Sequence, residues 1–302
     1  MLRVKDVSKV YKTGMFGGSE FTAVSGVSFD VEPGEVVSLI GESGSGKTTV
    51  GKMILRLTGV TSGSITFGGV EVSALRKSQL RGYYAQVQGV FQDPFSSYNP
   101  VFKADRVFEL IRGNYLRGMS RSEWNGKVRR SLEDVGLEPA DVLGKYPHQL
   151  SGGQLQRLLI ARALLLDIQF LVADEIISML DASTRIDVLN LLGDLKARGL
   201  GILFVTHDLS LGNYISDKTI ILRRGRIVEM GATEKVFGDP RHAYTRMLLS
   251  SVPQFGHKWE KLEDLDLSES DAASADMRPG VLDEGAAGDL LEVDRDHFVA
   301  TG

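Results

Sequence analysis

The chain has 302 residues, of which 42% are hydrophobic and 25% charged, with a formal net charge of -4. This length and composition allow one large or two modest globular domains. The sequence contains no cysteine, which excludes disulfides, thiolate metal sites and thiol catalysis. It has no run of apolar residues as long as a transmembrane helix and no signal-peptide pattern at its start, so we expect neither a membrane span nor export.

The charge is unevenly distributed along the chain. Residues 257–302 contain 13 acidic and 4 basic residues, a net charge of -9, which leaves +5 for residues 1–256. A mildly basic body suits a nucleotide but falls short of a dedicated nucleic-acid binder, so we expect no nucleic-acid partner. The acidic tail is poor in aromatic residues, which predicts that it is largely disordered or only loosely docked. Its apolar residues are still able to form a short amphipathic dock: Leu262, Leu265, Leu290, Leu291 and Val293. Truncation after Phe255 is therefore expected to leave nucleotide binding intact.

Two strands of near-alternating apolar residues are expected before residue 32. The first runs from Leu2 to Val10 and the second from Ala23 to Val31, with a glycine-rich stretch between them. Tyr11 ends the first strand. Its ring either packs on the core or stacks on the base of a ligand.

The next stretch combines an apolar strand over Val36–Ile40, a glycine-rich loop and a helix with periodic apolar residues. This order turns a G-x-x-x-x-G-K-[ST] match into a phosphate-binding hypothesis, although a glycine-rich turn can match by chance. Glycines let several N–H groups converge on one anion at the positive end of the helix. Lys47 supplies a charge for β- and γ-phosphates, and the Thr48 hydroxyl is positioned to ligate magnesium. The loop residues are Gly41, Glu42, Ser43, Gly44, Ser45, Gly46, Lys47, Thr48 and Thr49.

A helical insertion is expected over about residues 93–165, because apolar residues there recur at three- and four-residue spacings. It follows a buried strand that ends in the polar Gln92. The last helix of the insertion begins with Ser151-Gly152-Gly153-Gln154, and Ser151 and Gln154 have the spacing of a capping box. The two glycines leave the start of this helix bare. A phosphate is thereby able to approach its backbone donors.

Polar residues also end two later strands. Asp174 and Glu175 follow an apolar run from Phe170, and His207 follows the strand Gly201–Thr206. In a parallel sheet these strand ends lie at the edge that carries the phosphate loop, where ligands bind. Asp174 is suited to organise a magnesium shell, and Glu175 to accept a proton from an attacking water. Singly, such residues are more often solvated or structural, but their repetition at one edge favours a catalytic site.

In these motifs the chain resembles the ATP-binding subunits of ATP-binding-cassette (ABC) transporters, over roughly residues 1–255. The matching motifs occur in the family's order: the Walker A loop (residues 41–48), the Q-loop glutamine Gln92, the signature (residues 150–154), the Walker B strand (residues 170–175), the D-loop Leu180-Asp181 and the switch histidine His207. The resemblance implies an α/β P-loop NTPase fold. Its core sheet is expected to be mixed but mainly parallel, with an N-terminal antiparallel β part and an inserted helical subdomain.

The resemblance also implies ATP and Mg²⁺ as cofactors and assigns roles to residues. The catalytic residues are Glu175, His207 and Gln92, and the metal site comprises Thr48, Gln92 and Asp174. ATP is expected to bind the Walker A loop, with Tyr11 stacking on adenine. In a head-to-tail dimer, the partner closes the site over the γ-phosphate with its signature residues. The remaining nucleotide-binding residues are Ser151, Gly152, Gly153, Gln154 and Asp181.

Two stretches narrow the resemblance to the oligopeptide and dipeptide importers, namely residues 90–100 and residues 240–253 with Tyr244. The implied domains are an ATPase domain (1–235), a C-terminal segment (236–256) and an acidic tail (257–302). The implied partners are transmembrane permease subunits, a second ATPase subunit, commonly a different chain, and indirectly an extracytoplasmic solute-binding protein. The expected location is peripheral, on the cytoplasmic side of the cell membrane.

Two alternatives stay open at this point. The same branch also imports oligosaccharides and nickel. A soluble ABC ATPase acting on nucleic acid or ribosomes belongs to a different class, which typically carries a coiled-coil insertion or tandem cassettes; this chain has one Walker A and no sustained heptads. The chain also departs from the family's usual residues at four positions, which puts loop rigidity in doubt but removes no group that touches nucleotide. These positions are Ile168, Ile176, Ile177 and Met179.

Overall fold

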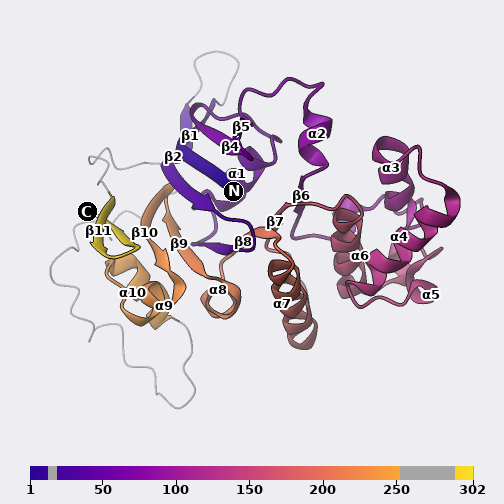
Figure 1. The fold of residues 1–302 in the computed structure, drawn as a ribbon. Helices are drawn as coiled ribbons and strands as arrows, with labels where there is room; N and C mark the ends of the chain where they lie inside the picture. The colour runs from indigo at the N-terminus through magenta and orange to yellow at the C-terminus, as the bar shows by residue number, and fades with distance from the viewer. Residues whose placement is uncertain (13–18, 252–289, 302) are drawn as a thin grey trace.

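The computed structural model describes residues 1–12, 19–251 and 290–301. Two sheets and a helical lobe build the molecule (Figure 1). The smaller sheet is antiparallel, with the strand order β2-β1-β4-β5. Its strands are β1 (Leu2–Lys12), β2 (Glu20–Val31), β4 (Ser62–Phe67) and β5 (Val70–Glu71). The expected antiparallel N-terminal part is therefore present.

The larger sheet has the order β11-β12-β10-β9-β3-β8-β7-β6. Its core strands run parallel: β9 (Lys218–Arg223), β3 (Val36–Ile40), β8 (Gly201–Thr206), β7 (Phe170–Asp174) and β6 (Val87–Val90). Three antiparallel strands extend one edge: β10 (Arg226–Ala232), β12 (His297–Ala300) and β11 (Leu290–Asp294). This mixed, mainly parallel sheet confirms the fold class expected from the sequence.

The helices fall into two groups in Figure 1. Those of the helical lobe are α3 (Arg106–Tyr115), α4 (Arg121–Glu133), α5 (Pro139–Val142) and α6 (Gly152–Leu164). The others are α1 (Lys47–Ile54), α2 (Leu80–Tyr84), α7 (Ala182–Ala197), α8 (Leu209–Ile215), α9 (Thr233–Gly238) and α10 (Ala243–Ser250). None of the helices in the described part of the chain combines the length and apolar character needed to cross a bilayer.

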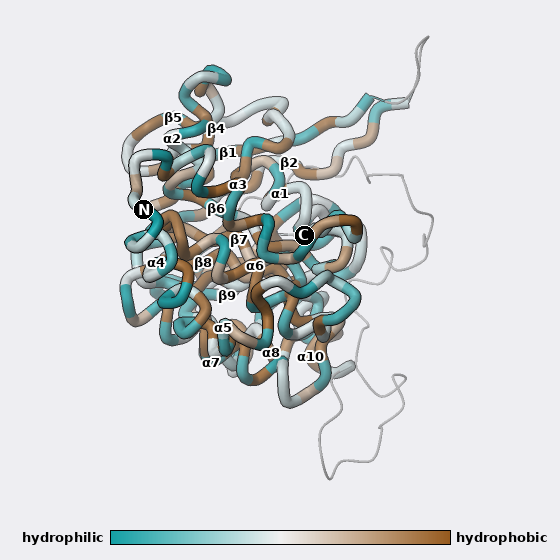
Figure 2. The backbone as a smooth tube through the Cα atoms, turned by 90° about the vertical axis from the view of Figure 1, so that its right-hand side faces the viewer, coloured by the Kyte–Doolittle hydropathy of each residue, from teal (hydrophilic) through white to brown (hydrophobic). Residues whose placement is uncertain are grey.

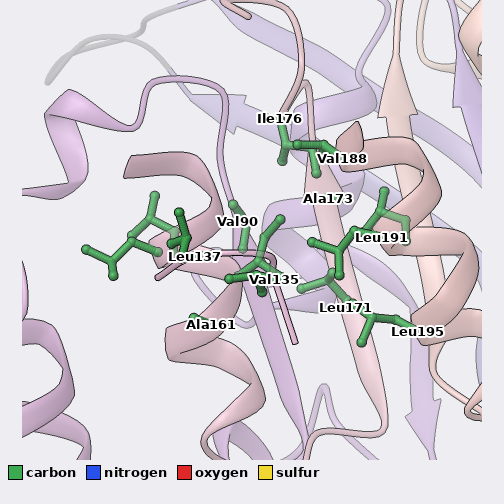
Figure 3. Packing of buried hydrophobic residues seen from close by; sticks show 14 of the residues in the cluster. Val90, Val135, Leu137, Ala161, Leu171, Ala173, Ile176, Val188, Leu191 and Leu195 are labelled. Atoms are coloured by element: carbon green, nitrogen blue, oxygen red, sulfur yellow. The ribbon is translucent and has the colours of Figure 1, made fainter. Parts of the chain in front are cut away.

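Alternating side chains of the central strands build the core on both faces of the large sheet. Leu171 of β7 and Phe204 of β8 face the cluster that includes α6 and α7 (Figure 3). Their neighbours Val172 and Val205 face the opposite cluster, which includes α1 and the smaller sheet. Figure 2 shows hydrophobic stretches along the strands in the middle of the molecule. Because these strands are buried on both faces, they read as continuous apolar runs in the sequence.

Residues 290–301 of the tail form strands, in the stretch where the sequence allowed a short amphipathic dock at Leu290, Leu291 and Val293, so the expectation of disorder does not hold for them. Strands β11 and β12 form a hairpin, and β12 pairs with β10 at the edge of the large sheet. The acidic composition of the tail as a whole masks this short segment, whose His297 is fully enclosed. Residues 252–289 lie outside the described residues, as do the glycine-rich residues 13–18. The division of the chain into three domains stays a prediction.

Candidate functional site

The phosphate loop connects β3 to α1, and two of its glycines cannot be replaced without displacing backbone. A Cβ on Gly41 would lie 2.1 Å from the Leu222 carbonyl oxygen, and one on Gly46 would lie 2.5 Å from that of Ala23. Gly46 also has a φ of 106°, a left-handed conformation that favours glycine. The start of α1 carries no side-chain cap. Its free N–H groups and positive dipole end therefore suit a bound anion.

Lys47 is buried at the start of α1, and its ammonium group is directed back into the loop. Nζ donates to the Gly41 carbonyl at 2.7 Å and to the Glu42 carbonyl at 2.8 Å. Burial lowers the pKa of Lys47, while the carboxylates of Glu175 and Asp174 oppose that shift. A buried ammonium needs compensation by oxygen atoms. The Gly41 and Glu42 carbonyls supply two of them, and a phosphate bound in the neighbouring cavity would supply more.

Thr48 and Asp174 form the oxygen pair expected of a magnesium site. The Thr48 hydroxyl donates to Asp174 Oδ1 at 3.3 Å, which links α1 to the end of β7. Asp174 is buried, and this desolvation raises its pKa. No group of three or more His, Asp or Glu side chains gathers into a metal cluster within the described ranges. Mg²⁺ takes few protein ligands and completes its shell with water and phosphate oxygens, so the two oxygen atoms of Thr48 and Asp174 suit it.

Glu175 and His207 meet at the ends of β7 and β8. Glu175 Oε1 lies 3.2 Å from His207 Nδ1, and the Glu175 side chain is only 19% exposed. The backbone N–H of Glu175 donates to the Val205 carbonyl at 2.9 Å. Its φ of 51° is left-handed, a costly conformation for a residue with a Cβ. Such strain persists where the surroundings fix it, and it is typical of functional sites.

These groups share one cavity of about 730 Å³ with the phosphate loop. Gln92 also lines it, so the structure brings together the Walker A, Gln92, Glu175 and His207 of the sequence prediction. Ser45 has a buried hydroxyl without a partner among the described residues. The full lining is Phe21, Ala23, Ile40, Gly41, Glu42, Ser43, Gly44, Gly46, Lys47, Thr48, Thr49, Gln92, Glu175, His207 and Leu248.

Four lining residues were not predicted as site residues: Phe21, Ala23, Ile40 and Leu248. Phe21 pairs with Tyr11 across β1 and β2, so both aromatic residues belong to the same region. Tyr11 does not line the cavity; Lys9 Nζ lies 4.9 Å from the centroid of its ring. Its stacking on adenine stays a prediction. Phe21 lies before the second strand expected from the sequence, and no motif indicated that it reaches the phosphate loop.

The signature residues lie apart from this cavity. Ser151 Oγ accepts from the Gln154 N–H at 3.1 Å, and Gln154 Oε1 accepts from the Ser151 N–H at 2.9 Å, which confirms the predicted capping box. Ser151, Gly153 and Gln154 line a separate hollow of about 210 Å³ together with Thr184. Within one described chain, the signature and the phosphate loop therefore line two separate cavities. Gly152 completes the same bare helix start.

Asp181 of the D-loop caps α7. Its Oδ1 accepts from the Thr184 N–H at 3.0 Å and its Oδ2 from the Thr184 hydroxyl at 2.8 Å. These hydrogen bonds, together with one from Ser183, hold the pKa of Asp181 well below its usual range. Asp181 does not line the phosphate-loop cavity. Its expected contact with nucleotide stays a prediction.

The unusual residues near the D-loop have definite places. Ile176 and Ile177 are buried in the core cluster that also includes residues of α7, and Figure 3 shows Ile176 among the residues of this cluster. Ile168 packs partly buried against the same cluster. Met179 is 61% exposed. None of these side chains enters the phosphate-loop cavity.

The residues present fit a magnesium-bound nucleoside triphosphate. The backbone cradle at Gly41 and Gly46 admits no side chain, and a buried ammonium and an unpartnered hydroxyl face the same loop. Thr48 and Asp174 supply the hard oxygen atoms that Mg²⁺ prefers. Glu175 then stands where it can accept a proton from water.

Comparison with known families agrees with this arrangement. The ABC transporter family model matches residues 24–178, and the model of the C-terminal region of oligopeptide/dipeptide transporters matches residues 228–278. The dipeptide transport ATP-binding protein DppF of Lactococcus lactis is 42% identical over 257 residues, covering 84% of this chain and 81% of that protein. The oligopeptide transport ATP-binding protein OppF of Streptococcus mutans is 40% identical over 255 residues, with 84% and 82% covered.

Solved structures share the fold. The ATP-binding cassette MJ0796, in a dimeric post-hydrolysis state bound to ADP and Pi, has a TM-score of 0.69 and 29% identity. The match covers 77% of this chain and 99% of that one. CbiO1 from Clostridium perfringens, part of an ABC transporter complex, has a TM-score of 0.68 and 24% identity. The match covers 79% of this chain and 90% of that one, and at this identity it supports the fold alone.

Proposed function

The chain belongs to the ABC transporter family of ATP-binding proteins, and from this premise we propose that it is the ATP-hydrolysing subunit of a membrane importer for peptides. Lys47, Thr48, Glu175 and His207 line one cavity, and Asp174 is linked to it by the hydrogen bond from Thr48; this arrangement carries the proposal for ATP hydrolysis. The transport-related C-terminal match over residues 228–278 and the names of the relatives support peptides as the transported class.

The proposed chemistry divides the work among few residues. When bound, MgATP would supply the γ-phosphoryl group, whose bond to the bridging oxygen breaks as water attacks the phosphorus and ADP leaves. Lys47 and the N–H groups at the start of α1 would neutralise phosphate charge, while Thr48 and Asp174 would hold the metal. Glu175 accepts the proton of the water, and His207, 3.2 Å from it, orients that carboxylate. Gln92, on the rim of the cavity, would complete the metal shell.

The proposed site needs two chains. The signature residues around Ser151 line a separate cavity and do not line the phosphate-loop cavity. A head-to-tail dimer would bring the signature of one subunit over the triphosphate held by the other. The dimeric state of the structural neighbour MJ0796 supports this arrangement. We expect the partner to be a second ATPase subunit, with permease subunits contacted through the segment that follows Gln92.

That segment offers apolar groups for a contact. Phe95 is 51% exposed and Val101 74% exposed, and both lie between Gln92 and α3. Exposed large apolar side chains grouped in one segment are typical of an interaction surface. They support a peripheral location against the permease on the cytoplasmic side of the membrane.

Alternative functions make different demands. Importers of oligosaccharides or nickel would use the same ATP site, so only the names of the relatives favour peptides over them. A soluble ATPase acting on nucleic acid or ribosomes would be expected to show a basic binding face. The mildly positive body and the match to a transporter C-terminal region argue against that class.

The test is co-purification with candidate permease subunits, followed by ATPase assays with loaded solute-binding proteins. Stimulation by a peptide-loaded binding protein, and by none loaded with sugar or nickel, is the expected result. Stimulation by an oligosaccharide or nickel would move the substrate to another class within the same branch. ATPase activity that responds only to RNA or ribosomes would reject the transport function.

A further inference from the structure

The C-terminal helix α10 reaches the phosphate loop through one hydroxyl group. Tyr244 is 3% exposed, and its OH accepts a hydrogen bond from the backbone N–H of Glu42 at 3.3 Å. The carbonyl of the same peptide unit, that of Gly41, accepts from Lys47 Nζ at 2.7 Å. The Gly41–Glu42 peptide is therefore held at both of its polar ends. Its orientation decides where the loop directs its N–H groups.

The two holds respond differently to a ligand. Lys47 has three N–H donors and directs two of them to loop carbonyls, so phosphate oxygens compete with the loop for this ammonium. The hydrogen bond between Glu42 and Tyr244 does not involve Lys47, so it does not have to break when the ammonium turns to phosphate oxygens. Burial raises the pKa of Tyr244 and keeps the phenol neutral. Leu248, one turn further along α10, lines the same cavity.

The start of α10 is anchored by a buried carboxylate from the edge of the large sheet. Glu229 of β10 is 0% exposed; its Oε1 accepts from the Arg241 N–H at 2.8 Å and its Oε2 from the His242 N–H at 3.0 Å. His242 then caps the helix, because its Nδ1 accepts from the Tyr244 N–H at 3.1 Å. A buried carboxylate that receives both N–H groups fixes the start of α10 against β10.

The C-terminal hairpin provides the remaining partner of this carboxylate. His297 of β12 is 2% exposed, and its Nε2 lies 2.8 Å from Glu229 Oε1. A second link joins the hairpin to α9, where Lys235 Nζ lies 2.8 Å from Asp294 Oδ2. Contacts therefore run without interruption from β12 through Glu229 and α10 to the phosphate loop.

We propose that Tyr244 is a positioning residue for the phosphate loop and that the C-terminal hairpin, through His297 and Glu229, holds it in place. The hairpin thereby belongs to the nucleotide site although it touches no part of the cavity. This inference rests on the proposed ATPase function and deepens it, since it assigns a role at that site to the C-terminal segment.

The test compares Tyr244→Phe with Tyr83→Phe in the full chain. Both variants lose one buried hydroxyl that bonds to backbone, because Tyr83 OH donates to the Ile54 carbonyl at 2.6 Å, at the far end of α1. For Tyr244→Phe we expect the Kd for MgATP and the KM for ATP to rise about 3- to 10-fold, with kcat within about twofold, as one lost hydrogen bond predicts. Tyr83→Phe is expected to lower thermal stability and to leave Kd unchanged.

The positioning role is overturned if the Kd of Tyr244→Phe for MgATP equals that of the parent, or if the Kd of Tyr83→Phe rises by the same factor as that of Tyr244→Phe. Lys47→Ala measured alongside separates this inference from the proposed function. If Lys47→Ala loses MgATP and Tyr244→Phe does not, only the inference has failed. If the parent protein does not bind MgATP, the proposed function has failed.

The link to the hairpin is tested by a double-mutant cycle. His297→Ala should raise the Kd for MgATP by about 2- to 3-fold in the parent and by no further factor in Tyr244→Phe, because residues that act through one element are not additive. A parental Kd for His297→Ala, or the same rise in both backgrounds, removes the hairpin from the account. Circular dichroism of each variant confirms that the sheet is retained.

Discussion

Replacement of Glu175 by glutamine isolates the proposed proton acceptor. The substitution removes one negative charge but keeps the length of the side chain and its capacity for hydrogen bonds. The backbone of residue 175 is fixed by its N–H bond to Val205, and the next two residues, Ile176 and Ile177, are buried. These contacts do not depend on the charge. The variant is therefore expected to fold and to retain the 3.2 Å approach to His207.

The expected size of the effect follows from the role of a general base. Such groups contribute about 10²- to 10⁴-fold to a rate, which corresponds to about 2.7 to 5.4 kcal/mol of transition-state stabilisation. Glu175 is largely shielded from solvent, so bulk water cannot replace it easily. Turnover of Glu175→Gln should therefore fall by at least about 100-fold. Binding of MgATP should stay at the parental level or tighten, because one charge that repels phosphate is gone.

The assay measures phosphate release at saturating ATP, the Kd for MgATP, and dimerisation by size-exclusion chromatography with the partner ATPase. Glu175→Gln should accumulate as an ATP-bound, closed dimer when the partner site is also blocked. Glu133→Gln, on the exposed face of α4, is the matched control for loss of a carboxylate and should behave as the parent. Near-parental turnover by Glu175→Gln would remove this residue as the base.

Three further changes test the rest of the site. Lys47→Ala should weaken MgATP binding and abolish turnover, measured by calorimetry and phosphate release, because the cradle loses its fixed charge; turnover at the parental rate would reduce the loop to a turn. Asp174→Asn should lose Mg²⁺-dependent ATP binding, whereas Glu175→Gln should keep it. An equal loss of ATP binding in the two variants would show that the roles of these neighbours are wrongly divided. Burial lowers the pKa of His242 below its usual value, so the folded state favours the neutral imidazole that caps α10. Its contribution to the unfolding free energy is full above about pH 6.5 and declines as the pH falls below that value. Urea unfolding at about pH 7.5 and about pH 5.5 should show a smaller loss for His242→Asn than for the parent; equal losses would contradict the assignment.

The sequence predicts the core of the fold because local patterns there agree with tertiary placement. The strand expected over Gly201–Thr206 is β8 with the same bounds. Both faces of this strand are buried, so its apolar run is unmistakable. The phosphate loop is equally legible, since its backbone geometry requires glycine at fixed positions such as Gly41 and Gly46. At these sites, the residue types favoured by the local backbone conformation are the same as those required by the tertiary structure.

The sequence predicts less where a structure depends on one distant partner. The hairpin β11–β12 lies in an acidic stretch, and it is held by pairing with β10 and by the burial of His297 on Glu229, 68 residues away in the chain. Composition averages over such a contact. The expectation that truncation after Phe255 leaves nucleotide binding intact takes no account of it. Gly113 is a further case: glycine disfavours a helix interior and by itself predicts a loop, yet α3 continues through this residue.

The candidate site shows the same division. Motifs placed Lys47, Asp174, Glu175 and His207 at one sheet edge. In the structure Lys47, Glu175 and His207 line one cavity, and Asp174 accepts a hydrogen bond from Thr48 of the same lining. Tyr244 stood in a stretch recognised only as a C-terminal segment. Its bond to Glu42 joins residues 202 positions apart, and no periodicity encodes that contact.

The most direct test of the account is ATP-dependent uptake of a labelled peptide into proteoliposomes that contain the chain, its partner ATPase and the permease subunits. With a peptide-loaded binding protein outside and MgATP inside, we expect uptake that stops when Glu175→Gln replaces the parental chain. Assembly of the complex should be unchanged by this substitution. Peptide uptake that continues undiminished with Glu175→Gln, while the partner ATPase site is also blocked, would contradict the claim that hydrolysis at this site drives import.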